Sequence, residues 1–211
     1  MKVERGVTLI EVALVLTVTV AIVGALAPTL AAVVRNAETT AANTAMTNLK
    51  NQIITMISTD LGPIGYSYFT INGTTTGTQV QLLVSDGDIP RDCSATAGAC
   101  TSWQATVNST TGLVDFLERH LVTNAPRGSA ANDYPNDEGA TPDAYWKGSY
   151  LTAPIDPDPW GNRYMVNVQY LGASTNDVVV LSAGPDEEID TEFTAVSLSA
   201  GGDDLIVLVE G

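Results

Sequence analysis

An uninterrupted apolar run near the N-terminus constrains this chain more than any other feature. From Val12 to Val34, 23 residues contain no Lys, Arg, Asp, Glu, Asn, Gln or His. Because a helix of roughly 20 apolar residues crosses a bilayer, this run predicts a membrane-spanning helix. Lys2 and Arg5 precede the run, and basic residues favour the cytoplasmic side. We therefore expect a cytoplasmic N-terminus and a globular part outside the cytoplasm.

A single acidic residue, Glu11, lies at the start of this helix. An ionisable group at the edge of a membrane helix is costly and is usually kept for a function. If the chain were cut after Gly6, the new amino group on Val7 would lie one helical turn before Glu11. The carboxylate would then pair with the ammonium of its own chain or of a neighbouring chain. The second arrangement would set the axial register between stacked subunits.

The segment Gly6-Val7-Thr8-Leu9-Ile10-Glu11, followed by an apolar helix that contains Pro28, resembles the class III signal of type IV pilins and pseudopilins. In that family a prepilin peptidase cuts after the glycine and methylates the new N-terminus. The resemblance implies that Gly6 is the cleavage residue, Val7 the mature N-terminus and Glu11 the assembly glutamate. The family usually has Phe or Met at the position of Val7.

Two other interpretations of the N-terminus remain. Ala25-Leu26-Ala27 has the small-x-small form of a signal-peptide cleavage site. Alternatively, the helix is an ordinary single-span anchor in which Glu11 has no role.

The helical pattern continues beyond the apolar run. One apolar stripe recurs at spacings of three and four residues and predicts an amphipathic helix; it comprises Ala42, Met46, Leu49, Ile53 and Ile57. Gly62-Pro63 ends the pattern, so a helix from Val7 to about Asp60 would be roughly 80 Å long. We expect a leader at 1–6, a transmembrane and filament-core half-helix at 7–34, an amphipathic half-helix at 35–62 and a globular head at 63–211.

The head is expected to contain a small, mainly antiparallel sheet. Tyr164–Tyr170 alternates loosely, while Val178–Gly184 and Leu205–Val209 have the composition of buried strands. The segment Val80–Val84 fits a strand or a short helix equally well. Thr111–Val122 predicts a short amphipathic helix with His120 on the surface. The fold class is therefore α+β, and the resemblance implies the lollipop shape of pilins, with a long helix packed on the head.

The charge distribution excludes some partners. The formal net charge is −15, and from Asp177 to the C-terminus there are nine acidic residues and no Lys or Arg. This surface would repel phosphates, so direct nucleic acid binding is not expected. Cations or a basic partner would suit it better. Cys93 and Cys100 would form a disulfide in an oxidising compartment, and a zinc site is disfavoured because His120 is the only histidine.

The C-terminal third carries a second resemblance. It contains, in order, Asp158-Pro159-Trp160-Gly161-Asn162, Leu181-Ser182-Ala183-Gly184-Pro185-Asp186 and a Gly-Asp-Asp unit. These segments resemble the major pseudopilins of type II secretion, in which the loop after Ser-Ala-Gly-Pro-Asp binds calcium. The resemblance implies calcium ligands on the side chains of Asp186, Asp203 and Asp204, with the carbonyl of Leu181 and Ser182 as further ligands.

An insertion from Glu187 to Gly202 separates the two acidic groups, which the family holds a few residues apart. Asp190 or Glu192 is therefore an alternative ligand. A solvated acidic loop without metal is the competing interpretation.

These features predict a structural subunit rather than an enzyme. Asp156 and Asp158 are candidate paired carboxylates for acid–base chemistry, but their position between prolines indicates a rigid turn. The sequence contains no phosphate loop, zinc signature or nucleophile elbow.

We expect a precursor in the bacterial inner membrane that is processed by prepilin peptidase. It would then polymerise with copies of itself and minor pseudopilins on an inner-membrane assembly platform into a periplasmic or extracellular filament. The expected system is a type II secretion pseudopilus. The alternatives are a surface pilus for adhesion, motility or DNA uptake, and a monomeric membrane-anchored calcium-binding domain.

Overall fold

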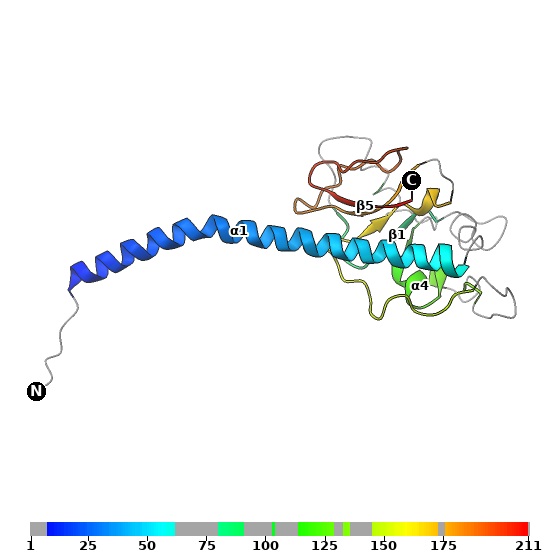
Figure 1. The fold of residues 1–211 in the computed structure, drawn as a ribbon, viewed down its shortest axis with the longest axis horizontal. Helices are drawn as coiled ribbons and strands as arrows, with labels where there is room; N and C mark the ends of the chain where they lie inside the picture. The colour runs from blue at the N-terminus through cyan, green and yellow to red at the C-terminus, as the bar shows by residue number, and fades with distance from the viewer. Residues whose placement is uncertain are drawn as a thin grey trace, which may run out of the picture. The chain divides into compact units, whose positions relative to one another are not determined.

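The computed structural model describes residues 8–61, 80–90, 103, 114–128, 133–135, 145–172 and 176–210. The chain divides into two compact units, which meet between Thr40 and Ala41. Figure 1 shows the first unit as a single helical rod and the second as a sheet with short helices. Helix α1, Leu9–Ile54, contributes to both units.

In the first unit, α1 exposes apolar side chains all round. Its large apolar residues from Leu9 to Val34 are between 48% and 86% exposed. The polar atoms of this part are satisfied locally, because Thr17 and Thr19 donate their hydroxyls to the carbonyls of Ala13 and Val15, each at 2.8 Å. Such local bonding lets hydroxyl groups enter an apolar environment. Among the described residues, Leu9–Leu61 is one helix long and apolar enough to cross a membrane, with a mean hydropathy of 2.5 in its most apolar window.

Pro28 lies inside α1. Proline has no backbone N–H, so the carbonyl of Gly24 loses its usual helical partner, and the ring pushes against that carbonyl. Thr29 directly follows the proline, and its hydroxyl donates to the carbonyl of Leu26 at 2.7 Å. Pro28 is therefore the position at which α1 bends most easily.

In the second unit, the C-terminal part of α1 is amphipathic, as predicted. Its apolar stripe is buried: Ala42, Met46, Leu49, Ile53 and Ile57 are at most 3% exposed. A π-helical segment, η1, continues α1 over Thr55–Leu61. The described helical path therefore reaches Leu61, the residue before the predicted stop at Gly62-Pro63.

The described residues of the second unit form a five-stranded sheet with the order β2-β1-β3-β4-β5. The strands are β1 Leu82–Val84, β2 Val114–Phe116, β3 Met165–Val166, β4 Val178–Ser182 and β5 Leu205–Glu210. Pairs β1–β3, β3–β4 and β4–β5 are antiparallel. Pair β1–β2 is parallel. The α+β class is therefore confirmed, and the sheet is mixed, with two strands more than the three expected.

The two faces of the sheet bury different partners. Along β4, Val178 and Val180 face one apolar cluster, while Val179 and Leu181 face the other. The first cluster contains the apolar stripe of α1, which crosses the sheet in Figure 1. This two-residue alternation is the normal consequence of strand geometry. With both faces covered, all five residues of β4 are buried.

The insertion 187–202 covers the second face of the sheet. Ile189 and Phe193 are buried there, and Phe193 packs edge-on against Trp103, with ring centroids 4.8 Å apart. Trp103 is fully buried and donates its indole N–H to the carbonyl of Thr191 at 2.9 Å. The insertion therefore contributes Ile189 and Phe193 to the core, while other residues of it, such as Val196, are exposed.

The predicted helix 111–122 is shorter than expected. Val114–Phe116 forms strand β2, and α4 occupies only Leu117–Leu121. The expectation of a surface position for His120 is wrong, because this residue is 2% exposed. Its Nε2 lies 2.9 Å from a carboxylate oxygen of Asp115, and its Nδ1 contacts the hydroxyl of Tyr134. Because β2 pairs with β1, the following helix α4 is held so that His120 faces the interior.

Within the described part of the second unit there are also two short 3-10 helices. Helix η2 occupies Pro126–Gly128 and follows α4. Helix η4 occupies Val168–Tyr170 and interrupts the segment predicted as a strand over 164–170. Only Met165–Val166 of that segment pairs in the sheet.

Candidate functional site

The N-terminal end of α1 is closed by a reciprocal contact between Thr8 and Glu11. Oε2 of Glu11 accepts bonds from the backbone N–H and the hydroxyl of Thr8, at 2.8 and 2.9 Å. The hydroxyl oxygen of Thr8 lies 3.3 Å from the backbone nitrogen of Glu11 and accepts its N–H. This arrangement is a capping box, which satisfies backbone donors that a helix leaves unpaired at its start.

Thr8 is a residue that the sequence reasoning missed. The signal was present, since Thr-x-x-Glu before an apolar run is the sequence pattern of a capping box. Glu11 consequently has a local structural role, in addition to the assembly role predicted for it. Both bonds to Thr8 are made by Oε2, so the capping box leaves Oε1 unused.

Four of the predicted residues lie outside the described part of the chain. These are the cleavage residue Gly6, the mature N-terminus Val7, and the disulfide candidates Cys93 and Cys100. Processing and disulfide formation therefore stay predictions.

The Asp158-to-Asn162 turn is a rigid polar anchor at the end of β4. Asp158 is 4% exposed, and its Oδ1 accepts the backbone N–H groups of Trp160 and Asn162 at 3.0 and 2.8 Å. Its Oδ2 accepts the hydroxyl of Ser182 at 2.6 Å. Burial raises the pKa of Asp158 despite these donors. Because Asp156 is exposed, the two carboxylates occupy different environments and do not form an acid–base pair.

Of the predicted calcium ligands, Asp186 and Asp203 are brought together. Burial raises the pKa of Asp203, and the adjacent carboxylate of Asp186 raises it further. Gly184 allows this approach, because its φ is +69° and a Cβ there would overlap the carbonyl oxygen of Asp203. Two carboxylates held side by side are suited to a hard cation with oxygen ligands. The pair supplies carboxylate oxygens toward the six to eight oxygen ligands that calcium takes.

The other predicted ligands have hydrogen-bond or strand partners elsewhere. Ser182 donates its hydroxyl to Asp158, and Leu181 lies within β4, paired with Ile206 of β5. Asp204 accepts the backbone N–H groups of Asp190 and Thr191 at its Oδ2, at 2.9 and 2.7 Å. Burial raises the pKa of Asp204 to about 6, with a smaller contribution from the charge of Asp190.

Among the described residues, there is no group of three or more Asp, Glu, Cys or His side chains that could hold a metal ion. Glu192, the other alternative ligand, is exposed.

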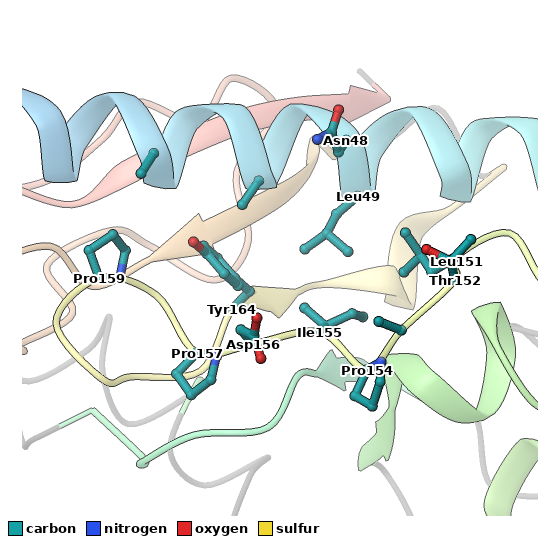
Figure 2. Close-up of a pocket in the computed structure, with 13 residues that line it drawn as sticks. Asn48, Leu49, Leu151, Thr152, Pro154, Ile155, Asp156, Pro157, Pro159 and Tyr164 are labelled. Carbon is teal, nitrogen blue, oxygen red and sulfur yellow. The ribbon is translucent and has the colours of Figure 1, made fainter.

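The head also contains an apolar groove of about 410 Å³ beside α1. Figure 2 shows Asn48 and Leu49 on one side and the proline-rich segment 151–159 on the other, with Tyr164 between them. Asp156 and Tyr164 are the titratable side chains among its lining residues. Burial raises the pKa of Tyr164, and the charge of Asp158 adds to this effect. The groove therefore favours apolar contact over acid–base chemistry.

One family model matches the chain. It is "Type II secretion system (T2SS), protein G", and it matches residues 129–199. This range includes the Asp158 anchor, strand β4 and most of the insertion. No curated protein matches, and no solved structure matches.

The matched family is structural and not enzymatic, and its members are membrane-anchored and assemble into a filament with other secretion components. The apolar helix α1 and the mixed sheet agree with this family. The match to protein G of type II secretion supports the assignment of this chain to the pilin and pseudopilin family, as a pseudopilin-like structural subunit.

Proposed function

We propose that this chain is the precursor of a subunit that polymerises into a type II secretion pseudopilus. The observation that carries the proposal is the exposed apolar surface of α1 between Leu9 and Val34. Burying apolar surface stabilises by about 25 cal/mol per Å², so this surface is unfavourable in water. Lipid covers it before assembly, and the equivalent helices of other copies cover it in a filament.

The order of events follows from the charges at the N-terminus. Lys2 and Arg5 keep the leader in the cytoplasm, so the head is placed in the periplasm. Prepilin peptidase cuts after Gly6 and methylates Val7. The new ammonium pairs with Glu11, and the processed subunit joins its neighbours on the inner-membrane assembly platform. The apolar helices then leave lipid for the filament core.

Processing is tested by intact-mass measurement of the chain isolated from cells with and without a prepilin peptidase. With the peptidase, we expect a mature chain that begins at Val7, and without it the full precursor. Gly6→Val should retain residues 1–6, because a β-branched side chain replaces the small residue at the cut. Gly24→Ala is the matched control and should be cut normally, since a Cβ at Gly24 has nothing within 4 Å. Retention of residues 1–6 by the natural sequence in the presence of the peptidase would favour an anchored monomer.

We also propose that the Asp186–Asp203 pair holds a calcium ion. The adjacency of these two carboxylates supports the proposal, because their repulsion is relieved by a divalent cation. Calcium supplies charge neutralisation between the loop after β4 and the residues before β5.

Chelation should therefore lower the thermal stability of the full chain in detergent micelles. A ligand at 100 times its Kd stabilises the folded state by about 2.7 kcal/mol. Asp186→Asn should remove this calcium-dependent part of the melting temperature, whereas Asp156→Asn should retain it because Asp156 is exposed beside the groove. Identical melting curves with calcium and with chelator would exclude a calcium site at this pair.

A further inference from the structure

The apolar groove beside α1 has small residues on its helical wall. Ala41 and Ala45, one turn apart on α1, line the groove together with Leu49, and all three belong to the second unit. Facing them are Pro154 and Pro157 of the proline-rich segment (Figure 2). Small residues one turn apart let a second helix approach closely. The groove therefore suits the apolar face of another helix.

Asp156 adds a negative charge to this groove. Its side chain lines the groove and is exposed. Among the described residues, no Lys, Arg or His side chain forms an ion pair with this carboxylate. Opposite charges across an interface fix register and partner choice. An occupant that matches the groove therefore carries a positive charge next to an apolar face.

The chain itself presents such a face on the first unit. Leu30 and Val34, one turn apart on α1, are 61% and 51% exposed. Arg35 directly follows Val34 and is also exposed. It is the one basic residue between Arg5 and Lys50. Within the described part of the chain, no Asp or Glu side chain forms an ion pair with its guanidinium.

Arg35 marks the end of the apolar run from Val12 to Val34. In a membrane, an arginine at this position extends its guanidinium to the lipid headgroups while the apolar residues before it stay in lipid. When the helix leaves lipid, Leu30 and Val34 lose their apolar surroundings and Arg35 loses its anionic partners. The groove offers apolar walls and a carboxylate together, so it replaces both.

We propose that the groove of one copy binds the Leu30–Arg35 segment of a second copy, with Arg35 paired to Asp156. The inference rests on the proposed polymerisation and adds a contact between the helix of one subunit and the head of another. Leu30 and Val34 pack against Ala41 and Ala45 of the other copy. The ion pair fixes the register, because a slip of one helical turn would displace the charges by about 5.4 Å.

Charge reversal tests the pairing in cells. Asp156→Arg places two positive charges together, so the filament yield should fall at least about tenfold. Arg35→Asp should cause a comparable loss. The two substitutions combined should return the yield to within about threefold of the natural chain, because they restore the pair with opposite polarity. The yield is measured by immunoblotting of sheared filaments relative to the subunit in the membrane fraction.

The matched control is Asp88→Arg. It makes the same charge change at an exposed residue of the head that does not line the groove, so filament yield should stay normal. Melting of each variant in detergent micelles checks that the head is folded. A natural chain that forms no filaments would contradict the proposed polymerisation itself. If the natural chain assembles, normal yield from Asp156→Arg, or a double variant as defective as the single ones, would overturn the groove contact alone.

Crosslinking identifies the occupant directly. Photoreactive benzoylphenylalanine replaces Thr152, an exposed residue that lines the groove. Filaments are prepared from a mixture of copies labelled with light and heavy nitrogen, illuminated and analysed by mass spectrometry. The crosslink should join this position to residues 30–35 of a copy with the other label. Crosslinks to the same copy, to another part of a second copy, to a different protein or to lipid would overturn the proposal.

Discussion

Glu11→Ala is expected to prevent filament assembly while membrane insertion continues. In a filament core the ammonium of Val7 would have no counter-charge, and leaving one charge of a buried pair unpaired costs about 3–5 kcal/mol. Since about 1.4 kcal/mol changes an equilibrium tenfold, the filament yield should fall by well over tenfold. Filaments sheared from cells and membrane fractions, both detected by immunoblotting, measure the two quantities.

The capping box makes a sharper version of this experiment possible. Glu11→Gln keeps an oxygen that can accept the two bonds from Thr8 and removes only the charge. If charge pairing drives assembly, Glu11→Gln should fail as Glu11→Ala does. Thr8→Val removes the capping hydroxyl and should reduce filament yield only slightly, because losing a cap costs about 1 kcal/mol. Normal assembly of Glu11→Gln would mean that helix capping, and not charge pairing, explains the need for this residue.

Asp158→Ala is expected to cause the largest loss of stability in the head. Asp158 is buried and accepts three hydrogen bonds, from the backbone of Trp160 and Asn162 and from the hydroxyl of Ser182. The substitution leaves these donors without their acceptor, and each unsatisfied buried group costs about 1–3 kcal/mol. We expect the free energy of unfolding to fall by about 3–5 kcal/mol, measured by urea denaturation of the full chain in detergent micelles.

Asp156 provides a matched control for this substitution. It lies two residues away and is exposed beside the groove, so Asp156→Ala should change the free energy of unfolding by less than about 0.5 kcal/mol. Asp158→Asn keeps one acceptor oxygen and should lie between the two. Equal effects of Asp156→Ala and Asp158→Ala would contradict the anchoring role of Asp158.

The long helix is the part of the fold that was most predictable. Its apolar stripe from Ala42 to Ile57 repeats with the period of one helical face, and those residues are buried as predicted. The strands Val178–Ser182 and Leu205–Glu210 were also recognised, because continuous β-branched and aliphatic residues favour strands. Only the first is buried as predicted; the expected burial of the second is wrong, because β5 ends the strand order and Leu208 is 47% exposed. Each of these signals is local, since it depends on residues a few positions apart.

His120 and Trp103 show where local signals failed. In a helix over 111–122, His120 was expected on the surface, but β2 pairs with β1 and places it beside Asp115 and Tyr134. Trp103 stands alone in a polar segment, and its burial depends on Phe193, which is far away in the sequence. The spacing of apolar residues within either segment does not reveal the burial of His120 or Trp103.

The acidic region of the C-terminal third was likewise predictable only in part. Composition alone indicated a surface suited to cations or a basic partner between Asp177 and the C-terminus, because nine acidic residues occur there without Lys or Arg. Which carboxylates meet was decided by the return of the chain after the insertion, which places Asp203 beside Asp186 and Asp204 beside Asp190.

The apolar helix, its capping box and its buried stripe follow from neighbouring residues, because helix geometry is set within a few turns. The strand order, the burial of His120 and the pairing of acidic residues arise only when distant segments pack on both faces of one sheet.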